Sequence, residues 1–306
     1  MVTLTSDVVG ANFTWTATAT AGVTGFTTNG TNTIPVQTIS TSGTTQGTVT
    51  YVITPDAIGC TGPTTNYTVL VSPSPTVTNT PLTQTICSGA STTLVTLTSD
   101  VVGTNFTWTA TATVGVTGFT ANGSNTIPVQ TISTSGTTQG TVTYAITPDV
   151  GGCSGPTTNY TILVNPPPTV TNTPLTQTIC SGASTTLVTF TSDVVGVNFT
   201  WTANATAGVT GFTTNGTNTI PVQTISTSGT AQGTVTYVIT PDASGCTGPT
   251  TNYTVLVNPS PTVTNTPLTQ TICSGASTAL VTLTSDVVGA NFTLSLIHIS
   301  EPTRPY

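Results

Sequence analysis

The chain has 306 residues, a formal net charge of −7 and charged side chains at only 3% of its positions, where soluble proteins usually have roughly a quarter. Its single Lys or Arg is Arg304 and its single histidine is His298, so residues 1–293 carry acidic groups and no base. A surface without cations cannot neutralise phosphates, and no run of 18 or more apolar residues is present, so we expect neither nucleic-acid binding nor membrane insertion.

The sequence repeats itself with a period of 93 residues. Tryptophan recurs at Trp15, Trp108 and Trp201, and the segment TSDVVG places aspartate at positions 7, 100, 193 and 286. A unit of this length exceeds the roughly 20–50 residues of a solenoid repeat and suits a self-contained domain. In chain order we expect a truncated repeat at 1–71, complete repeats at 76–165 and 169–258, and a truncated repeat at 262–293, joined by stiff proline-rich linkers.

Both ends of the chain interrupt this repeat. Met1 stands where later copies have Leu94 and Leu187, inside an expected strand, so we interpret it as an internal start and expect the signal peptide to be missing through truncation. After Thr293 the repeat stops, and residues 294–306 resemble the conceptual translation of a sequencing-library adapter. We therefore exclude residues 294–306 from reasoning about fold and function.

The second repeat predicts about seven strands. Strands are expected at 76–86, 92–98, 105–111, 127–133, 140–147 and 159–164, with a hairpin inside 118–126 and a loop at 148–158. In 105–111, Phe106 and Trp108 alternate with threonines, and this period of two places the aromatic rings in a core. The pair Asn122-Gly123 predicts a two-residue turn with positive φ at both positions. Pro128 marks its strand as an edge.

Seven short strands with a tryptophan on the third are typical of an immunoglobulin-like sandwich. The cassette ICSGAS, LVTLTSD, NFTW, GTVTYVITP and NYTVLV resembles the PKD-like and Ig-like repeats of very large secreted surface proteins of Bacteroidota, many of which carry a type IX secretion or gliding-motility-associated domain. The resemblance covers essentially all of residues 1–293. It implies all-β tandem sandwich domains, an extracellular, cell-surface location and a role in adhesion or as a spacer. It supplies no catalytic residue and no cofactor.

Each 93-residue unit contains two cysteines, which indicates disulfides formed in an oxidising compartment. Because the linkers lie outside the segments 87–153 and 180–246, we predict the bridges Cys87–Cys153 and Cys180–Cys246. The alternative is a bridge such as Cys60–Cys87, which would clamp adjacent repeats across a linker. Two thiols without histidine are too few ligands for a zinc site.

The aspartates offer one candidate metal site. Asp100 and Asp149 are expected in two loops at the same end of the sandwich, and Asp193 and Asp242 repeat this arrangement. Two carboxylates with loop carbonyls could hold Ca²⁺, which prefers several oxygen ligands. The alternative is that each aspartate caps its own loop through backbone hydrogen bonds.

The tryptophans and threonines are interpreted structurally. Trp15, Trp108 and Trp201 are expected in the core, with a sugar-stacking surface as the alternative. Threonine ladders such as the one from Thr14 to Thr20 suit the solvent face of strands because β-branched side chains fit the pleat. Ice binding and O-glycosylation are the alternatives for these ladders.

Catalysis is not expected. Acid–base or nucleophilic chemistry needs a base beside a nucleophile or a pair of activated acids, and residues 1–293 offer only isolated aspartates. We therefore predict a structural or adhesive repeat stalk of a secreted protein, without a cofactor, whose partners are surface glycans, other cell-surface proteins and neighbouring repeats. The alternative is an array of carbohydrate-binding modules attached to a secreted hydrolase.

Overall fold

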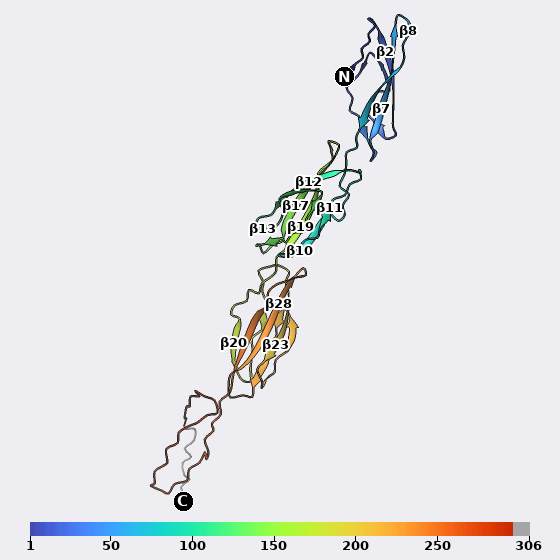
Figure 1. Ribbon diagram of the computed structural model, residues 1–306. Coiled ribbons are helices and arrows are strands. Elements are labelled where there is room, and N and C mark those ends of the chain that lie inside the picture. The colour runs from blue at the N-terminus through green and yellow to red at the C-terminus, as the bar shows by residue number, and fades with distance from the viewer. Residues whose placement is uncertain (296–306) are drawn as a thin grey trace. The chain divides into compact units, whose positions relative to one another are not determined.

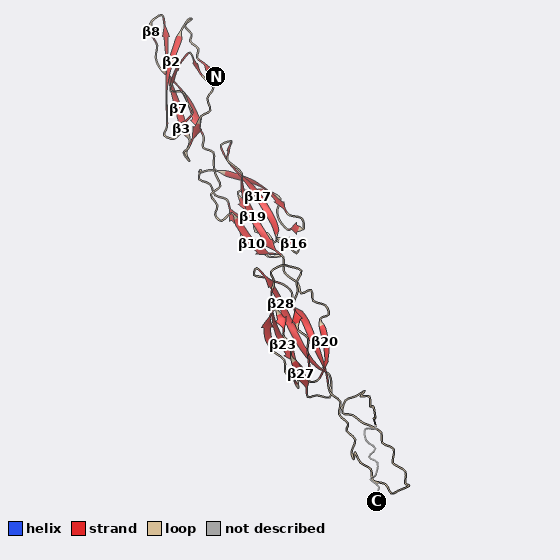
Figure 2. Cartoon of the chain, turned by 180° about the vertical axis from the view of Figure 1, so that it is seen from behind, coloured by secondary structure: helices blue, strands red, loops and turns tan. Residues whose placement is uncertain are grey.

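The computed structural model describes residues 1–295. Residues 296–306 lie outside the described residues. They include most of the segment 294–306, so the interpretation of that segment as a translated adapter stays a prediction. Every regular element of residues 1–295 is a β-strand, which confirms the all-β class (Figure 2). The described chain contains no helix of the length and apolarity needed to cross a membrane. The chain forms two compact units, one ending at Pro166 and the other beginning at Pro167.

The strands follow the same order in each repeat (Figure 1). The first repeat contains β1 (Val2–Thr3), β2 (Asn12–Ala19), β3 (Val23–Thr24), β4 (Asn29–Thr31), β5 (Thr33–Ile34), β6 (Ser40–Thr41), β7 (Gly47–Ala57), β8 (Cys60–Thr61) and β9 (Thr65–Val71). The second contains β10 (Thr83–Cys87), β11 (Val95–Thr96), β12 (Asn105–Ala112), β13 (Val116–Thr117), β14 (Asn122–Ser124), β15 (Thr126–Ile127), β16 (Ser133–Thr134), β17 (Gly140–Val150), β18 (Cys153–Ser154) and β19 (Thr158–Asn165). The third contains β20 (Thr176–Cys180), β21 (Ala183–Ser184), β22 (Val188–Thr189), β23 (Asn198–Ala205), β24 (Val209–Thr210), β25 (Asn215–Thr217), β26 (Thr219–Ile220), β27 (Thr224–Thr227), β28 (Gly233–Ala243), β29 (Cys246–Thr247) and β30 (Thr251–Asn258).

One large sheet dominates each complete repeat. In the second repeat its order is β10-β19-β17-β12-β14, with β18 paired to β17, and in the third it is β20-β30-β28-β23-β25, with β29 paired to β28. All pairs are antiparallel except β10 with β19 and β20 with β30, which are parallel. Short strand pairs such as β11–β15 and β13–β16 form the opposite layer. The two layers make an Ig-like sandwich around a core.

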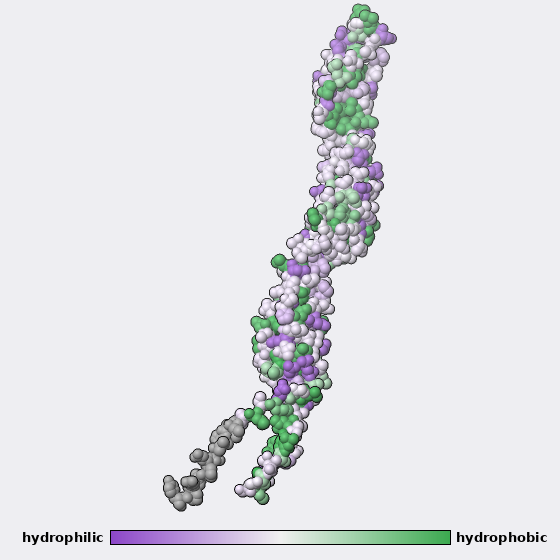
Figure 3. Space-filling model, turned by 90° about the vertical axis from the view of Figure 1, so that its left-hand side faces the viewer, coloured by the Kyte–Doolittle hydropathy of each residue, from purple (hydrophilic) through white to green (hydrophobic). Residues whose placement is uncertain are grey.

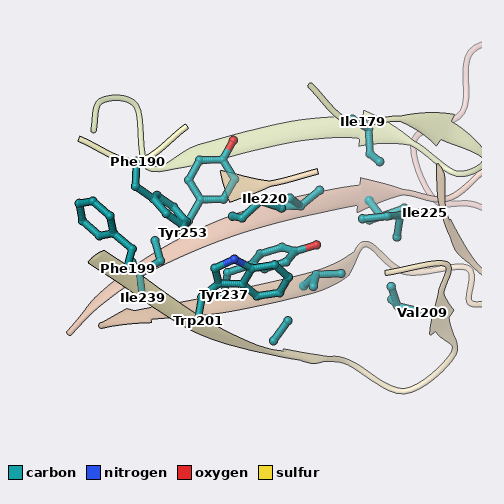
Figure 4. Packing of buried hydrophobic residues seen from close by; sticks show 14 residues of the cluster. Ile179, Phe190, Phe199, Trp201, Val209, Ile220, Ile225, Tyr237, Ile239 and Tyr253 are labelled. Carbon is teal, nitrogen blue, oxygen red and sulfur yellow. The ribbon is translucent and has the colours of Figure 1, made fainter. Parts of the chain in front are cut away.

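Aromatic residues of the large sheet build that core. In β12 the burial alternates so that Phe106 and Trp108 point inward, as the period-two pattern predicts. Tryptophan packs edge-on against a tyrosine of the neighbouring strand, with ring centroids 5.2 Å apart for Trp108–Tyr144 and 5.3 Å apart for Trp201–Tyr237. Figure 4 shows the third-repeat cluster, in which Tyr237 contacts Trp201 and Tyr253 in turn contacts Tyr237. Each of the first three repeats therefore packs its own hydrophobic cluster.

The predicted hairpin turn at Asn122-Gly123 is wrong. Both residues lie inside β14, paired with β12, and neither has a positive φ; the left-handed residue is Asn125, with φ 58°. Gly123 is needed for a different reason: a Cβ built on it would overlap the Trp108 ring. The glycine makes room for the indole, and Asn125 forms the turn while its side-chain oxygen accepts a hydrogen bond from the Phe106 N–H.

The limits of several other strands differ from the prediction. The expected strand at 76–86 is regular only in β10, because residues 76–79 bond to the segment 96–100 instead of joining the large sheet. These bonds include a backbone hydrogen bond from the Thr78 N–H to the Thr98 carbonyl and an isolated antiparallel bridge between Val77 and Ser99. The expected strand at 92–98 shrinks to β11. The predicted loop 148–158 contains a hairpin formed by the end of β17 and β18. The differences at 76–86 concern hydrogen-bond partners distant in sequence, whereas the β17–β18 hairpin is a local pairing.

Candidate functional site at the loop end of each repeat

Two loops meet at one end of each of the first three repeats. The register pairs Asn105 at the start of β12 with Asp149 near the end of β17, so the loop before β12 and the hairpin β17–β18 lie at the same end of the sheet. In the first repeat the equivalent loops enclose a cleft of about 190 Å³ lined by Asp7, Asp56 and Cys60, among others. We refer to this region as the loop end.

Aspartate at the loop end holds the segment by which the chain enters the repeat. The Thr76 N–H donates to the Asp100 carboxylate over 2.7 Å, and the Ser99 hydroxyl donates to the same oxygen over 3.0 Å. The contact recurs between Thr169 N and Asp193 at 2.8 Å and between Thr262 N and Asp286 at 2.7 Å. This aspartate therefore fixes the linker to the repeat that follows it.

An asparagine three residues after the bonded threonine makes a second contact. We call the aspartate and asparagine contacts together the linker clamp. Asn79 donates to the Thr96 carbonyl and accepts from the Thr98 N–H, both over 2.8 Å. Asn172 and Asn265 make the same pair of bonds in the following copies. Sequence reasoning missed these residues. The signal was present, since the segment TVTNTP recurs with the same period as TSDVVG.

The linker also packs against the hairpin at the loop end. The Ser74 hydroxyl donates to the Ser154 carbonyl over 3.3 Å. A Cβ at Gly155 would collide with the Pro75 carbonyl oxygen, and Gly248 has the same relation to Pro168. Gly155 and Gly248 thus let the linker lie directly on the hairpin of their repeat.

The linker clamp lowers the pKa of its aspartates. The pKa of Asp100 lies below its ordinary value chiefly because the Thr76 N–H donates to the carboxylate, and Thr262 has the same effect on the pKa of Asp286. For Asp193 partial burial raises the pKa, but hydrogen bonds from Thr169 and Ser192 outweigh burial and leave the pKa lowered. Hydrogen bonds to the charged form are the physical cause in all three copies.

We predict that acid loosens the linker clamp. A carboxylate with a lowered folded-state pKa stabilises the fold above its unfolded pKa, about 3.9, and this contribution is lost as the pH falls through the folded value. Thermal unfolding followed from pH 5 to pH 2 should show falling midpoints. The triple variant Asp100→Asn, Asp193→Asn, Asp286→Asn keeps an acceptor oxygen but does not titrate, so its midpoints should fall less. An unchanged pH profile in the variant would contradict this role.

The second aspartate of each predicted calcium pair accepts hydrogen bonds from its own hairpin. Asp149 accepts from the Gly152 N–H at 3.3 Å and from the Ser154 hydroxyl at 2.9 Å, and Asp242 accepts from the Gly245 N–H at 3.2 Å and from the Thr247 hydroxyl at 3.0 Å. Within residues 1–295 no three His, Cys, Asp or Glu side chains gather as a metal-binding group. The local capping alternative accounts for every contact of these carboxylates described above.

The predicted bridges Cys87–Cys153 and Cys180–Cys246 are wrong. Cys153 and Cys180 are free thiols, as are Cys60 and Cys273, whereas Cys87 and Cys246 are disulfide-bonded. The register gives the reason. Cys87 is level with Asn165 at one end of the sheet, whereas Cys153 pairs with Val150 at the other end.

The two cysteines of one repeat are too far apart to bond. The strand β17 runs from Gly140, next to Val164, to Val150, and ten residues of strand span about 33 Å. A disulfide needs Cα atoms within roughly 7 Å. The alternative bridge Cys60–Cys87 is also absent, because Cys60 is a free thiol.

We predict that peptide mapping of the non-reduced chain will recover no peptide linking Cys87 to Cys153 or Cys180 to Cys246. Cys153 and Cys180 should react with a thiol-alkylating reagent without prior reduction. Cys87 and Cys246 should react only after reduction. Protection of Cys153 in the non-reduced chain would show that the register described above is wrong.

The tryptophans lie in the core, away from the loop end. Trp15, Trp108 and Trp201 are each 3% exposed, and each indole N–H donates to a backbone carbonyl, as Trp108 does to Thr126 over 3.0 Å. A buried ring with a satisfied N–H offers no face to a sugar. Among the aromatic residues of the complete repeats, none is exposed in the structure.

Sequence reasoning also missed Gln130, a buried polar residue of the core. Gln130 is 7% exposed; its side-chain amide donates to the Tyr144 hydroxyl over 3.0 Å and to the Pro128 carbonyl, while its oxygen accepts from the Thr120 N–H. The glutamine thereby connects the segment between β15 and β16 to Tyr144 of the large sheet. Its signal is the segment IPVQTIS, which recurs in the first three copies.

Comparison with solved structures gives only distant similarities. No curated protein matches the chain. Solved structures of similar fold include protocadherin gamma B2 extracellular cadherin domains 3–6 (10% identity, TM-score 0.35, covering 81% of this chain and 67% of that one) and mouse cadherin-23 EC22–24 (12%, 0.32, 81% and 86%). The insect immune protein hemolin is similar at 11% identity and a TM-score of 0.31, with 81% and 67% covered. At these values the likeness carries no information about function.

A family model decides the assignment. The model of the PKD-like domain matches three successive segments of the chain, residues 1–75, 84–168 and 177–261. Together these segments make up most of the sequence and contain the three buried tryptophans. The chain therefore belongs to the PKD-like domain family, as a tandem array of its domain.

Proposed function

We propose that the chain is a structural and adhesive stalk of a secreted, cell-surface protein of the Bacteroidota type, without catalytic activity of its own. The linker clamp is the observation that carries this proposal. In three copies an aspartate and an asparagine bind the entering chain to the next repeat. Each connector is thus ordered on the repeat that follows it, which supports a role of the array as a spacer.

The chemistry of the surface supports an extracellular role. Threonine hydroxyls bond between neighbouring chain segments, for example Thr78 to Thr98 at 2.9 Å and Thr147 to Thr157 at 3.0 Å, in place of ion pairs. Hydrogen bonds between uncharged groups depend little on ionic strength, whereas surface ion pairs are screened by salt. Such a surface suits a protein exposed to changing salt outside the cell.

Repetition supports adhesion. Many weak copies can bind strongly together because each binding event raises the effective concentration of the next. A weak contact made by one repeat would therefore be amplified along the array. We expect the partners to be surface glycans or other cell-surface proteins.

The test displays the full chain on beads and presents it to a glycan array and to cell surfaces. The proposal expects attachment that rises steeply with the density of chain on the bead and no turnover of any glycan. The carbohydrate-binding alternative expects a different result. One glycan should then bind tightly at every density of chain on the bead, and Asp100→Ala and Asp193→Ala should abolish this binding. Val102→Ala, at a 96% exposed loop residue, is the matched control.

A further inference from the structure

A groove opens on the side of the second repeat, between β10 of the large sheet and β11 of the opposite layer. It has a volume of about 350 Å³ and is lined by residues of the segments 79–84 and 93–96 and by Tyr160 of β19. Sites for small molecules usually have volumes of about 300–1,000 Å³. The groove lies wholly within a complete repeat and is large enough for one small ligand.

Tyr160 brings a buried hydroxyl to this groove. The side chain is 4% exposed, and its hydroxyl bonds to no residue of the described chain, whereas the Tyr144 hydroxyl accepts a hydrogen bond from Gln130 over 3.0 Å. Its counterpart Tyr253 is 5% exposed and likewise unbonded within residues 1–295, and Figure 4 shows its hydroxyl pointing away from Trp201. Burial raises the pKa of both tyrosines above the ordinary value of 10.0, so each hydroxyl stays a donor at neutral pH. A buried donor without a partner is costly, and a ligand oxygen in the groove would satisfy it.

The walls of the groove add polar groups that the fold leaves unused. The Gln84 side-chain oxygen accepts from the Thr93 N–H over 3.4 Å, which orients the amide, while the NH₂ group of Gln84 has no partner among the described residues. The hydroxyls of Thr83 and Thr96 are exposed and also make no hydrogen bond in the part of the chain that the structure describes. The Thr96 carbonyl is bonded to Asn79, so this part of β11 is ordered. Groups preorganised in this way lower the entropic cost of binding.

The charge of the groove restricts its ligand to neutral molecules. None of the residues that line it is charged, and the face drawn in Figure 3 is mostly pale, with strongly hydrophilic residues scattered over it. A buried ion would lack a partner of opposite charge, and a purely apolar ligand would leave the hydroxyl and amide groups unpaired. Leu94, which is 58% exposed, and Pro81 add apolar surface. A sugar residue combines the hydroxyls and the C–H surface that such a groove matches.

We propose that this groove binds one neutral sugar residue of a surface glycan. Tyr160 donates to a sugar oxygen, Gln84 and Thr83 bond to neighbouring hydroxyls, and Leu94 packs against the C–H face of the ring. The third repeat has the same residues at all the equivalent positions. Such a site rests on the proposed function and gives the weak contact of each complete repeat a location, while repetition of the site along the chain raises the overall affinity.

Removal of the tyrosine hydroxyls tests the site. The double variant Tyr160→Phe, Tyr253→Phe deletes two groups that have no partner in the fold, so its thermal unfolding midpoint should equal or exceed that of the parent. The full chain is displayed on beads at one fixed density and presented to neutral, sialylated and sulfated oligosaccharides on an array. We expect the parent to be retained by neutral oligosaccharides and retention of the double variant to fall about tenfold, because each site loses a hydrogen bond and the sites act together.

Two further variants separate the groove from the rest of the surface. Thr83→Val with Thr176→Val removes hydroxyls at the wall of the groove and should also weaken retention. Thr107→Val with Thr200→Val is the matched control. These threonines are exposed on β12 and β23, and Thr107 does not line the groove, so retention should stay at the level of the parent.

The outcomes distinguish this site from the proposed function. Equal retention of the parent and the tyrosine variant overturns the site, as does retention by sialylated or sulfated oligosaccharides alone. Attachment of the parent to cells without retention by any neutral oligosaccharide also overturns it. All three results leave adhesion in place. A lowered unfolding midpoint in the tyrosine variant would show that the hydroxyls have partners in the fold and would likewise overturn the site. A parent that attaches to no glycan and no cell surface contradicts the proposed function too.

Discussion

Replacing Trp108 by alanine should unfold the second repeat and leave the third repeat folded. The indole is 3% exposed, packs on Tyr144 with centroids 5.2 Å apart and donates to the Thr126 carbonyl. Loss of a buried tryptophan costs about 3–5 kcal/mol, which is a large fraction of the 5–15 kcal/mol that holds a typical domain. Because each repeat has its own core cluster, the loss should stay local.

Hydrogen exchange measured peptide by peptide on the full chain checks this expectation. Protection should vanish in β12, β17 and β19 and remain in β23, β28 and β30. Val102→Ala, at a side chain 96% exposed, should change stability by less than about 0.5 kcal/mol. Loss of protection in both repeats would show that the domains do not fold separately.

Replacing Gly118 by alanine should have the second-largest effect. Gly118 has φ 87°, a conformation that side-chain-bearing residues avoid, and a Cβ there would collide with the Thr131 carbonyl oxygen. Strain at positive φ costs about 1–3 kcal/mol, and overpacking adds about 1–3 kcal/mol. A rigid backbone carbonyl cannot move aside as a flexible side chain could, so we expect at least about 2 kcal/mol of destabilisation.

Chemical denaturation of the variant measures this cost, with Gly136→Ala as the control. Gly136 has no positive φ, and a Cβ there would meet its nearest neighbour at 3.6 Å, an ordinary contact. The control should unfold with the midpoint of the parent. Equal midpoints for Gly118→Ala and Gly136→Ala would mean that the backbone near Thr131 relaxes freely.

The sequence predicts the central strands well because their signal is local. Phe106, Trp108 and the threonines between them alternate, and the alternation itself records which face of β12 is buried. The strands β17 and β19 follow from the same pattern at Val142, Tyr144 and Tyr160. The all-β class and the repeat of the domain need nothing beyond these patterns and the 93-residue period.

The features that the sequence did not predict depend on partners far along the chain. The pair Asn122-Gly123 has a sequence typical of a turn, yet glycine is required at position 123 because a Cβ there would overlap the Trp108 ring on the neighbouring strand. The cysteines were paired by their place between linkers, whereas the parallel pairing of β10 with β19 sends Cys87 to the far end of the sheet. The linker clamp joins Thr76 to Asp100 across 24 residues. Local patterns carry no signal for such contacts.

Pulling the full chain end to end under reducing conditions tests most directly whether the repeats are separately folded sandwiches. The complete repeats run from Thr83 to Asn165 and from Thr176 to Asn258. Each should open in its own event and lengthen the chain by about 250–300 Å, the contour of some eighty extended residues less the folded length. Two or more equal steps are the predicted result. A single event that releases the whole chain at once, or a featureless extension, would contradict the account.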